Sequence, residues 1–145
     1  AAIALKWPND VLLDGGKLSG ILLEMVRGST VVGIGVNLAQ APALPNRRTA
    51  ALADVVAPPP LEAFAVSLAA AFDLRLAAWR TFGLDATLHA FLRLSVHAQG
   101  APLTVHDTDG SVLSGSFAGL EESDGALRLR LADGHERVIR AGDIS

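Results

Sequence analysis

Residues 6–37 have the sequence KWPNDVLLDGGKLSGILLEMVRGSTVVGIGVN. Within it, the run DGGK at residues 14–17 predicts a hairpin turn, because glycine adopts positive φ at little steric cost. Apolar runs before this turn, after it at residues 18–26, and again at residues 31–38 predict strands. We therefore expect three strands joined by tight turns and paired side by side in a sheet.

Three glycines interrupt these predicted strands. Gly20 lies in the second strand, and Gly33 and Gly35 lie in the third; a glycine inside a strand usually marks a bulge or a close approach by a ligand. The hairpin would bring Asp10 and Lys17 to one end of the sheet, beside a trough left by the missing side chains. Such a trough suits a flat or anionic small molecule. The alternative is that Asp10 and Lys17 are turn residues and that the glycines are bulges.

The composition limits the classes of function. The chain has 145 residues, of which 50% are hydrophobic, enough for one ordinary domain or a small domain with an appendage. A net charge of −3 argues against nucleic-acid binding by bulk charge. Without cysteine there is no disulfide, thiolate zinc site or cysteine nucleophile, and the four histidines lack metal-ligand spacing. No apolar run approaches the ~18 residues of a membrane span, so a cytoplasmic protein without membrane partners is expected.

Two helices are predicted after an irregular, proline-rich connection over residues 39–60. Apolar residues recur every three or four positions from Leu61 to Arg80, and Pro60 suits the first turn of a helix. A second helix is expected at residues 84–94. Both helices are expected to cover the sheet, and a short helical turn is expected at residues 49–55.

From about residue 100 the pattern changes to short strands separated by Asp-Gly turns. In residues 127–131 leucine and arginine alternate strictly, which predicts leucines facing inward and arginines facing outward. Several short strands at this spacing indicate a small barrel. The predicted strands cover residues 102–106, 112–120, 126–131 and 136–140.

Two pairs of arginines lie within this pattern. Arg47 and Arg48 stand in the proline-rich connection, and Arg128 and Arg130 stand on the outward face of the predicted barrel. Each pair could meet a phosphate. For both, a solvated surface is the preferred interpretation.

The motifs KWPND, KLSGILLE and GIGVN, in this order and spacing, resemble the core of the biotin protein ligase family, the biotin–acetyl-CoA-carboxylase ligases. The chain after residue 100, with Gly115, Gly119 and the closing residues 142–144, resembles the SH3-like C-terminal domain of these ligases. The resemblance implies an α+β fold. A partial mixed or antiparallel sheet with covering helices, from a class II synthetase-like catalytic domain, would occupy residues 1–97, and a small SH3-like β-barrel residues 98–145.

The same resemblance implies a reaction in two steps. Biotin and ATP would give biotinyl-5′-AMP and pyrophosphate, and a lysine of the biotin carboxyl carrier protein of acetyl-CoA carboxylase would then displace AMP. Lys17 would neutralise the charge that develops between the biotin carboxylate and the α-phosphate, and Asp10 would orient Lys17. Mg²⁺ would come with ATP, with no site made by protein ligands alone and with Asp10 as a candidate contact.

The resemblance also implies two sets of binding residues. The nucleotide set is Asn37, Lys17 and Asn9. The biotin set comprises the lysine and the residues of the glycine trough: Lys17, Gly20, Ile21, Leu22, Gly33 and Gly35.

Two other functions stay open. One is a lipoate or octanoate ligase of the same fold, and the other is a non-catalytic ligand-binding or regulatory module. The first half of the biotin ligases carries a glycine- and arginine-rich loop, and this sequence contains no Gly-Arg-Gly-Arg-like run. We therefore expect the chain to lack that half, to be inactive alone, and to need the missing half, a partner chain or a homodimer.

Overall fold

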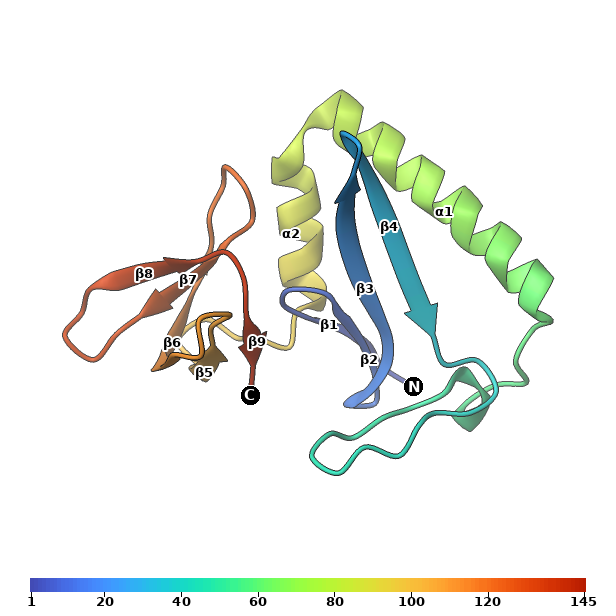
Figure 1. The fold of residues 1–145 in the computed structure, drawn as a ribbon, viewed down its shortest axis with the longest axis horizontal. Coiled ribbons are helices and arrows are strands. Elements are labelled where there is room, and N and C mark those ends of the chain that lie inside the picture. Colours follow the sequence, from blue (N-terminus) through green and yellow to red (C-terminus); the bar gives the residue numbers. More distant parts are fainter. The chain divides into compact units, whose positions relative to one another are not determined.

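The computed structural model describes all of residues 1–145 and contains two antiparallel sheets and two α-helices (Figure 1). The chain divides into two compact units, residues Ala1–Leu76 and Ala77–Ser145. The predicted α+β class is confirmed. The domain boundary between residues 97 and 98 stays a prediction.

The first unit is built on a four-stranded sheet in the order β1-β2-β3-β4, with every neighbouring pair antiparallel. The predicted hairpin turn is confirmed, since Asp14 and Gly15 have φ of 45° and 82°, both in the left-handed region that a two-residue turn requires. Arg27 and Gly28 make a similar turn, with φ of 49° and 80°. This second turn starts the last strand two residues before the predicted position. The strands are Ile3–Lys6 (β1), Asp10–Leu13 (β2), Gly16–Val26 (β3) and Ser29–Val36 (β4).

The connection after β4 folds back onto the beginning of β3. The Lys17 N–H donates to the Arg48 carbonyl at 2.9 Å, and the Ala50 N–H donates to the Lys17 carbonyl at 3.0 Å. Ala50 packs with Leu13 and Leu18 in a small buried core. The predicted helical turn is present as a short 3₁₀ helix, η1 (Leu52–Asp54). The connection is therefore anchored to the sheet at Lys17.

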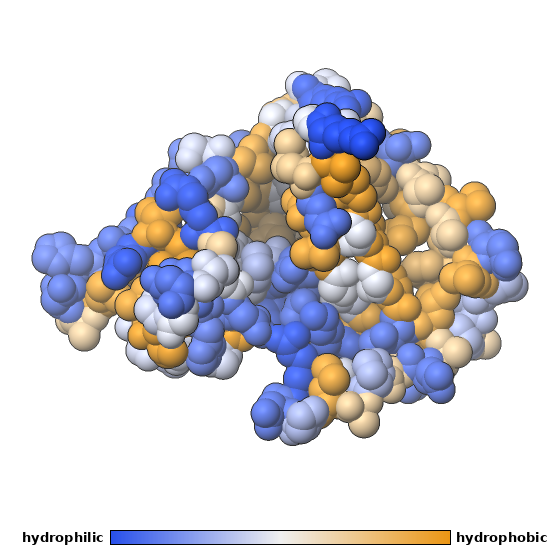
Figure 2. All heavy atoms as spheres, in the orientation of Figure 1, coloured by the Kyte–Doolittle hydropathy of each residue, from blue (hydrophilic) through white to orange (hydrophobic).

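Helix α1 (Leu61–Phe82) begins after Pro60, as predicted. Val32 and Ile34 of β4 line an apolar cavity of about 320 Å³ together with four residues of α1: Ala65, Leu68, Ala69 and Phe72. No residue of α1 is buried, and hydrophobic side chains gather over α1 and along β3 and β4 in Figure 2. The helix covers one face of the sheet loosely. No helix of the structure is long and apolar enough to cross a membrane.

The second unit contains helix α2 (Leu84–Leu94), at the predicted residues, and a five-stranded sheet in the order β8-β7-β6-β5-β9. Leu127 and Leu129 are fully buried, and Arg128 and Arg130, which alternate with them, face outward, as predicted. Gly115 allows β6 and β7 to approach, because a Cβ there would lie 2.9 Å from Cγ of Leu129. Closure into a barrel stays a prediction. The strands are Pro102–His106 (β5), Val112–Leu120 (β6), Leu127–Arg130 (β7), Glu136–Ile139 (β8) and the unpredicted Asp143–Ile144 (β9).

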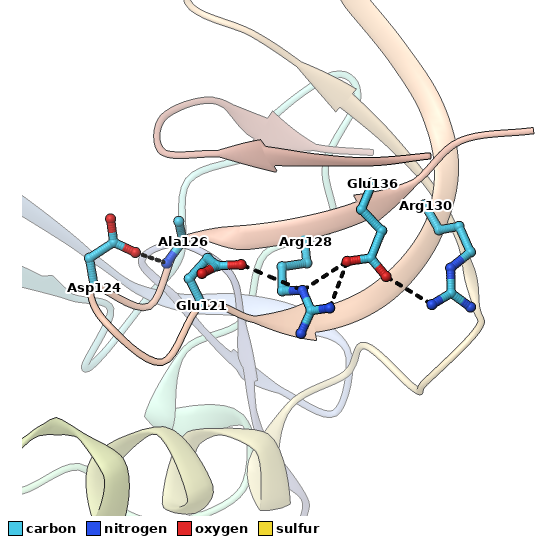
Figure 3. A network of polar contacts seen from close by, with 6 residues as sticks. All are labelled: Glu121, Asp124, Ala126, Arg128, Arg130 and Glu136. Carbon is cyan, nitrogen blue, oxygen red and sulfur yellow. Dashed lines mark hydrogen bonds and ion pairs between the residues drawn. The ribbon is translucent and has the colours of Figure 1, made fainter. Parts of the chain in front are cut away.

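A network of ion pairs joins β7 and β8 on the outer face of this sheet (Figure 3). Nε and Nη2 of Arg128 donate to Oε2 of Glu136 at 2.9 and 2.6 Å, and Nη2 of Arg130 donates to Oε1 at 2.8 Å. Arg128 also lies 3.5 Å from Oε1 of Glu121. Both arginines thus have carboxylate partners within their own sheet, which favours the solvated-surface interpretation over a phosphate contact.

These contacts make the stability of the second unit dependent on pH. Hydrogen bonds from Arg130 and Arg128 hold the pKa of Glu136 below its ordinary value of 4.5. A lowered carboxylate pKa stabilises the folded state above the ordinary value, and this stabilisation is lost as the pH falls through the folded pKa. We expect Glu136→Gln to lower the Tm at pH 6 and to reduce the fall in Tm on acidification below about pH 4.5.

The matched control is Glu24→Gln, which changes an exposed carboxylate on β3. Melting curves between pH 6 and pH 3 should show the wild-type fall in Tm for the control variant. An unchanged pH dependence in Glu136→Gln would contradict the assigned role of this network.

Candidate functional site

An ion pair between Asp10 and Lys17 lies at the centre of the first sheet. Nζ of Lys17 is 2.7 Å from Oδ1 of Asp10, and the side chains are 28% and 6% exposed. A buried carboxylate is costly unless a cation or hydrogen-bond donors compensate its charge. The ladder places Asp10 opposite Gly20 and Lys17 opposite Leu12. The two side chains meet because that of Lys17 extends along the strand over Gly20, which has no Cβ to block it. The sequence predicted both residues at one end of the sheet, and the structure joins them in an ion pair; their catalytic roles stay predictions.

Gly20 makes room for this ion pair. It lies opposite Asp10 in the β2–β3 ladder. A Cβ at Gly20 would lie 3.1 Å from both Cε and Nζ of Lys17, and 3.7 Å from Oδ1 of Asp10. The sequence allowed two interpretations of this strand glycine, a bulge or a close approach by another group. The structure supports the second, because the side chain of Lys17 lies close to Gly20.

The three strand glycines lie on one face of the sheet. Gly20 is the ladder partner of Gly35, and Leu22 is the ladder partner of Gly33, so these four residues point to the same side. A Cβ at Gly35 would meet no heavy atom within 4 Å. The glycines therefore leave open space, as the predicted trough requires.

A groove of about 420 Å³ lies along this space, a volume typical of a small-molecule site. It contains all six residues of the predicted biotin set, together with Asn9 of the nucleotide set; Ile34 was not predicted. Lys17 lies at the groove with its ammonium held by Asp10. The lining residues are Asn9, Lys17, Gly20, Ile21, Leu22, Gly33, Ile34 and Gly35.

The two asparagines of the predicted nucleotide set make different contacts. Nδ2 of Asn9 donates to the Ile21 carbonyl at 2.6 Å, which fixes the end of the KWPND motif to β3 beside the groove. Nδ2 of Asn37 donates to the carbonyls of Lys17 and Ala50, at 3.2 and 3.0 Å. Asn37 is not among the groove-lining residues; it ties β3 to the loop that follows β4. A nucleotide contact of Asn37 stays a prediction.

Arg47 also lies at the site, although the sequence favoured the interpretation that it belongs to a solvated loop. Its Nη1 lies 3.5 Å from Oδ2 of Asp10, and its side chain is 32% exposed. The contact depends on the connection after β4 folding back onto Lys17, and no local pattern around Arg47 signals that path. No group of three or more His, Cys, Asp or Glu side chains in residues 1–145 could hold a metal ion.

Comparison with known proteins finds two family matches. Residues 1–40 match the biotin/lipoate A/B protein ligase family. Residues 100–145 match the biotin protein ligase C-terminal domain. The first match contains the ion pair, the glycine groove and Asn37, and the second contains the whole five-stranded sheet.

Individual relatives match along nearly the whole chain. The biotin–[acetyl-CoA-carboxylase] ligase of Mycobacterium tuberculosis is 34% identical over 145 residues, covering 99% of this chain and 53% of the relative. The ligase of the same name from Paracoccus denitrificans is 37% identical over 161 residues, covering 99% and 63%. The chain thus spans between about half and two thirds of the length of these relatives.

A solved structure confirms the fold. The biotin protein ligase of Aquifex aeolicus, in complex with biotin and ATP, superposes with a TM-score of 0.81 at 21% identity, covering 99% of this chain and 61% of that one. Sheet, helices and C-terminal unit therefore all have counterparts in one known ligase. The two family matches, together with relatives that are 34% and 37% identical along 99% of this chain, show that the chain belongs to the biotin protein ligase family.

Proposed function

We propose that the protein carrying this chain is a biotin–protein ligase. It activates biotin with ATP to biotinyl-5′-AMP and transfers the biotinyl group to a lysine of the biotin carboxyl carrier protein of acetyl-CoA carboxylase. The observation that carries the proposal is the Asp10–Lys17 pair at the glycine groove. The names of the two curated relatives support the substrate, and the biotin and ATP in the related structure support the two ligands.

Lys17 acts in the first step. A carboxylate oxygen of biotin attacks the α-phosphorus of ATP, the bond to the bridging oxygen breaks, and pyrophosphate leaves. Negative charge develops between the carboxylate and the phosphate oxygens, and a positioned cation stabilises that transition state. The Lys17 ammonium is partly exposed at the groove and can follow the charge, because an ammonium is a compact point charge on a flexible stem.

Asp10 holds Lys17 in place during that step. In the second step the ε-nitrogen of the carrier lysine attacks the acyl carbon, the acyl–phosphate bond breaks, AMP leaves, and the amine loses a proton. We assign acceptance of that proton to Asp10 as a further role, since it is a carboxylate adjacent to the groove. Mg²⁺ would come with ATP and be held mainly by its phosphates. Asp10 is the candidate protein contact, and it would have to exchange its longer contact, to Arg47 at 3.5 Å, for the metal ion.

The groove binds the two ligands. Gly33 and Gly35 leave space for the biotinyl chain, Leu22 supplies an apolar side chain on the same face, and Ile21 lines the groove beside it. Asn9, directly before β2, and Asn37, directly after β4, bind the nucleotide. The reaction takes place in the cytoplasm, where ATP and the carrier protein meet.

A lipoate or octanoate ligase is the second candidate, because the family that matches residues 1–40 includes lipoate ligases. The match of residues 100–145 to a domain named for biotin protein ligases favours biotin. Pyrophosphate–ATP exchange separates the two candidates. Exchange that depends on biotin supports the proposal, and exchange that depends on lipoate or octanoate contradicts it.

The first prediction of the proposed function concerns Lys17. In the complete ligase, Lys17→Ala is expected to slow formation of biotinyl-5′-AMP by about 10²-fold or more, because it removes the cation that stabilises the transition state. The measurement is biotin-dependent pyrophosphate–ATP exchange. Arg27→Ala, which removes a cation from the β3–β4 turn, is the control and should keep the wild-type rate. A wild-type rate in Lys17→Ala would remove Lys17 from the mechanism.

The second prediction concerns the groove. Gly35→Val places a branched side chain in the open space, so biotin binding is expected to be lost. Folding is expected to survive, because a Cβ there has no heavy atom within 4 Å and valine favours strands. Calorimetric titration with biotin and a melting curve, both on the complete ligase, measure the two effects. Thr30→Val, on the same strand outside the groove, should bind biotin normally. Unfolding of Gly35→Val would mean that Gly35 serves backbone geometry.

The third prediction concerns the isolated chain. Residues 1–145 alone are expected not to biotinylate a carrier protein, because a reactive acyl-adenylate must be shielded from water and the groove is open to solvent. We propose that the remaining length of the relatives, in the same protein, in a partner chain or in a dimer, completes the site. Incubation with carrier, biotin and Mg-ATP, followed by a probe for biotinylated carrier, tests this. Robust transfer would contradict it.

A further inference from the structure

Asp10 contacts two cations that come from different segments. Lys17 of β3 lies 2.7 Å from one carboxylate oxygen, and Arg47 of the connection after β4 lies 3.5 Å from the other. The carboxylate is 6% exposed, whereas the two cationic side chains are 28% and 32% exposed. One buried anion thus faces two cations that reach solvent.

Two cations share the charge of Asp10. Asp10 and Lys17 alone would form a neutral pair, which attracts an entering anion weakly. Arg47 places a second cation against the buried carboxylate, and both cationic side chains are partly exposed. The attraction between unit charges at an effective dielectric constant near 20 is strong enough to affect ligand binding.

The backbone fixes the segment that carries Arg47. Hydrogen bonds join the Lys17 N–H to the Arg48 carbonyl and the Ala50 N–H to the Lys17 carbonyl, at 2.9 and 3.0 Å. Thr49 lies between Arg48 and Ala50 in the sequence, and its Oγ1 donates to the Pro42 carbonyl at 2.7 Å. The residue directly before this anchored stretch is Arg47, so its position relative to Lys17 is set by the main chain.

We propose that Arg47 is a positioning residue that balances the charge of Asp10 and so leaves the Lys17 ammonium available to a carboxylate or phosphate group entering the groove. The identity of the ligand, biotin, rests on the proposed function. Through Arg47, the connection after β4 takes part in anion recognition.

The test compares a charged and a neutral ligand on the complete ligase. Calorimetry measures the Kd of biotin, which carries a carboxylate, and of biotinamide, which does not. Arg47→Gln is expected to weaken biotin binding by roughly three- to tenfold and to leave biotinamide binding unchanged, as for the loss of one partly exposed charge. Arg47→Lys should restore most of the biotin affinity.

The matched control is Arg48→Gln. Arg48 neighbours Arg47 but lies over the β2–β3 turn, where its Nη1 is 3.6 Å from a Cβ built on Gly15. This variant should bind both ligands as the wild type does. If Arg47→Gln weakens both ligands by the same factor, or neither, Arg47 has only a structural role and the proposal is wrong.

Failure of the proposed function gives a different result. If the complete wild-type ligase binds neither biotin nor biotinamide, the biotin assignment fails, and inorganic phosphate then serves as the anionic probe. Phosphate should shift the amide NMR signals of Lys17 and Gly20 in the wild type and in Arg48→Gln, but not in Arg47→Gln. Absence of this difference would overturn the role of Arg47 independently of biotin.

Discussion

A buried carboxylate must be compensated, and the compensation of Asp10 organises the first unit of this protein. Lys17 reaches Asp10 by lying across Gly20, where any side chain would crowd its ammonium. The start of β3 is therefore fixed by the hairpin on one side and by the ion pair on the other. Arg47 reaches the same carboxylate because the connection after β4 pairs with the backbone of Lys17. The β2–β3 hairpin, the start of β3 and the connection after β4 therefore all contribute a residue to the charged cluster around Asp10.

The groove follows from the same arrangement. Beside the ion pair, the ladder pairs Gly20 with Gly35 and Leu22 with Gly33, so Leu22 is the one large side chain among these four residues of that face. The opposite face carries Val32 and Ile34 toward α1. A sheet face opened by glycines can bind a ligand next to a fixed cation. This combination supports the ligase proposal more directly than fold similarity does, since one fold serves many functions.

Much of this arrangement could be predicted from the sequence because its signals are local. The DGGK turn, the strand glycines and the apolar period of the long helix each act within a few residues, and all three predictions are confirmed. The contact of Arg47 with Asp10 could not be predicted, because it depends on the path of a proline-rich connection that has no periodic pattern. β9 was missed because two residues are too few to show an alternation.

Binding of the reaction intermediate to the groove is the central claim, and amide NMR spectra of the isotopically labelled complete ligase test it most directly. Titration with biotinyl-5′-AMP should shift the signals of Lys17, Gly20, Gly33 and Gly35 together, along one binding curve, because these residues line one groove. Shifts confined to the second unit, for example at Arg128 and Arg130, or no saturable shift at all, would contradict the assignment of this groove as the ligand site.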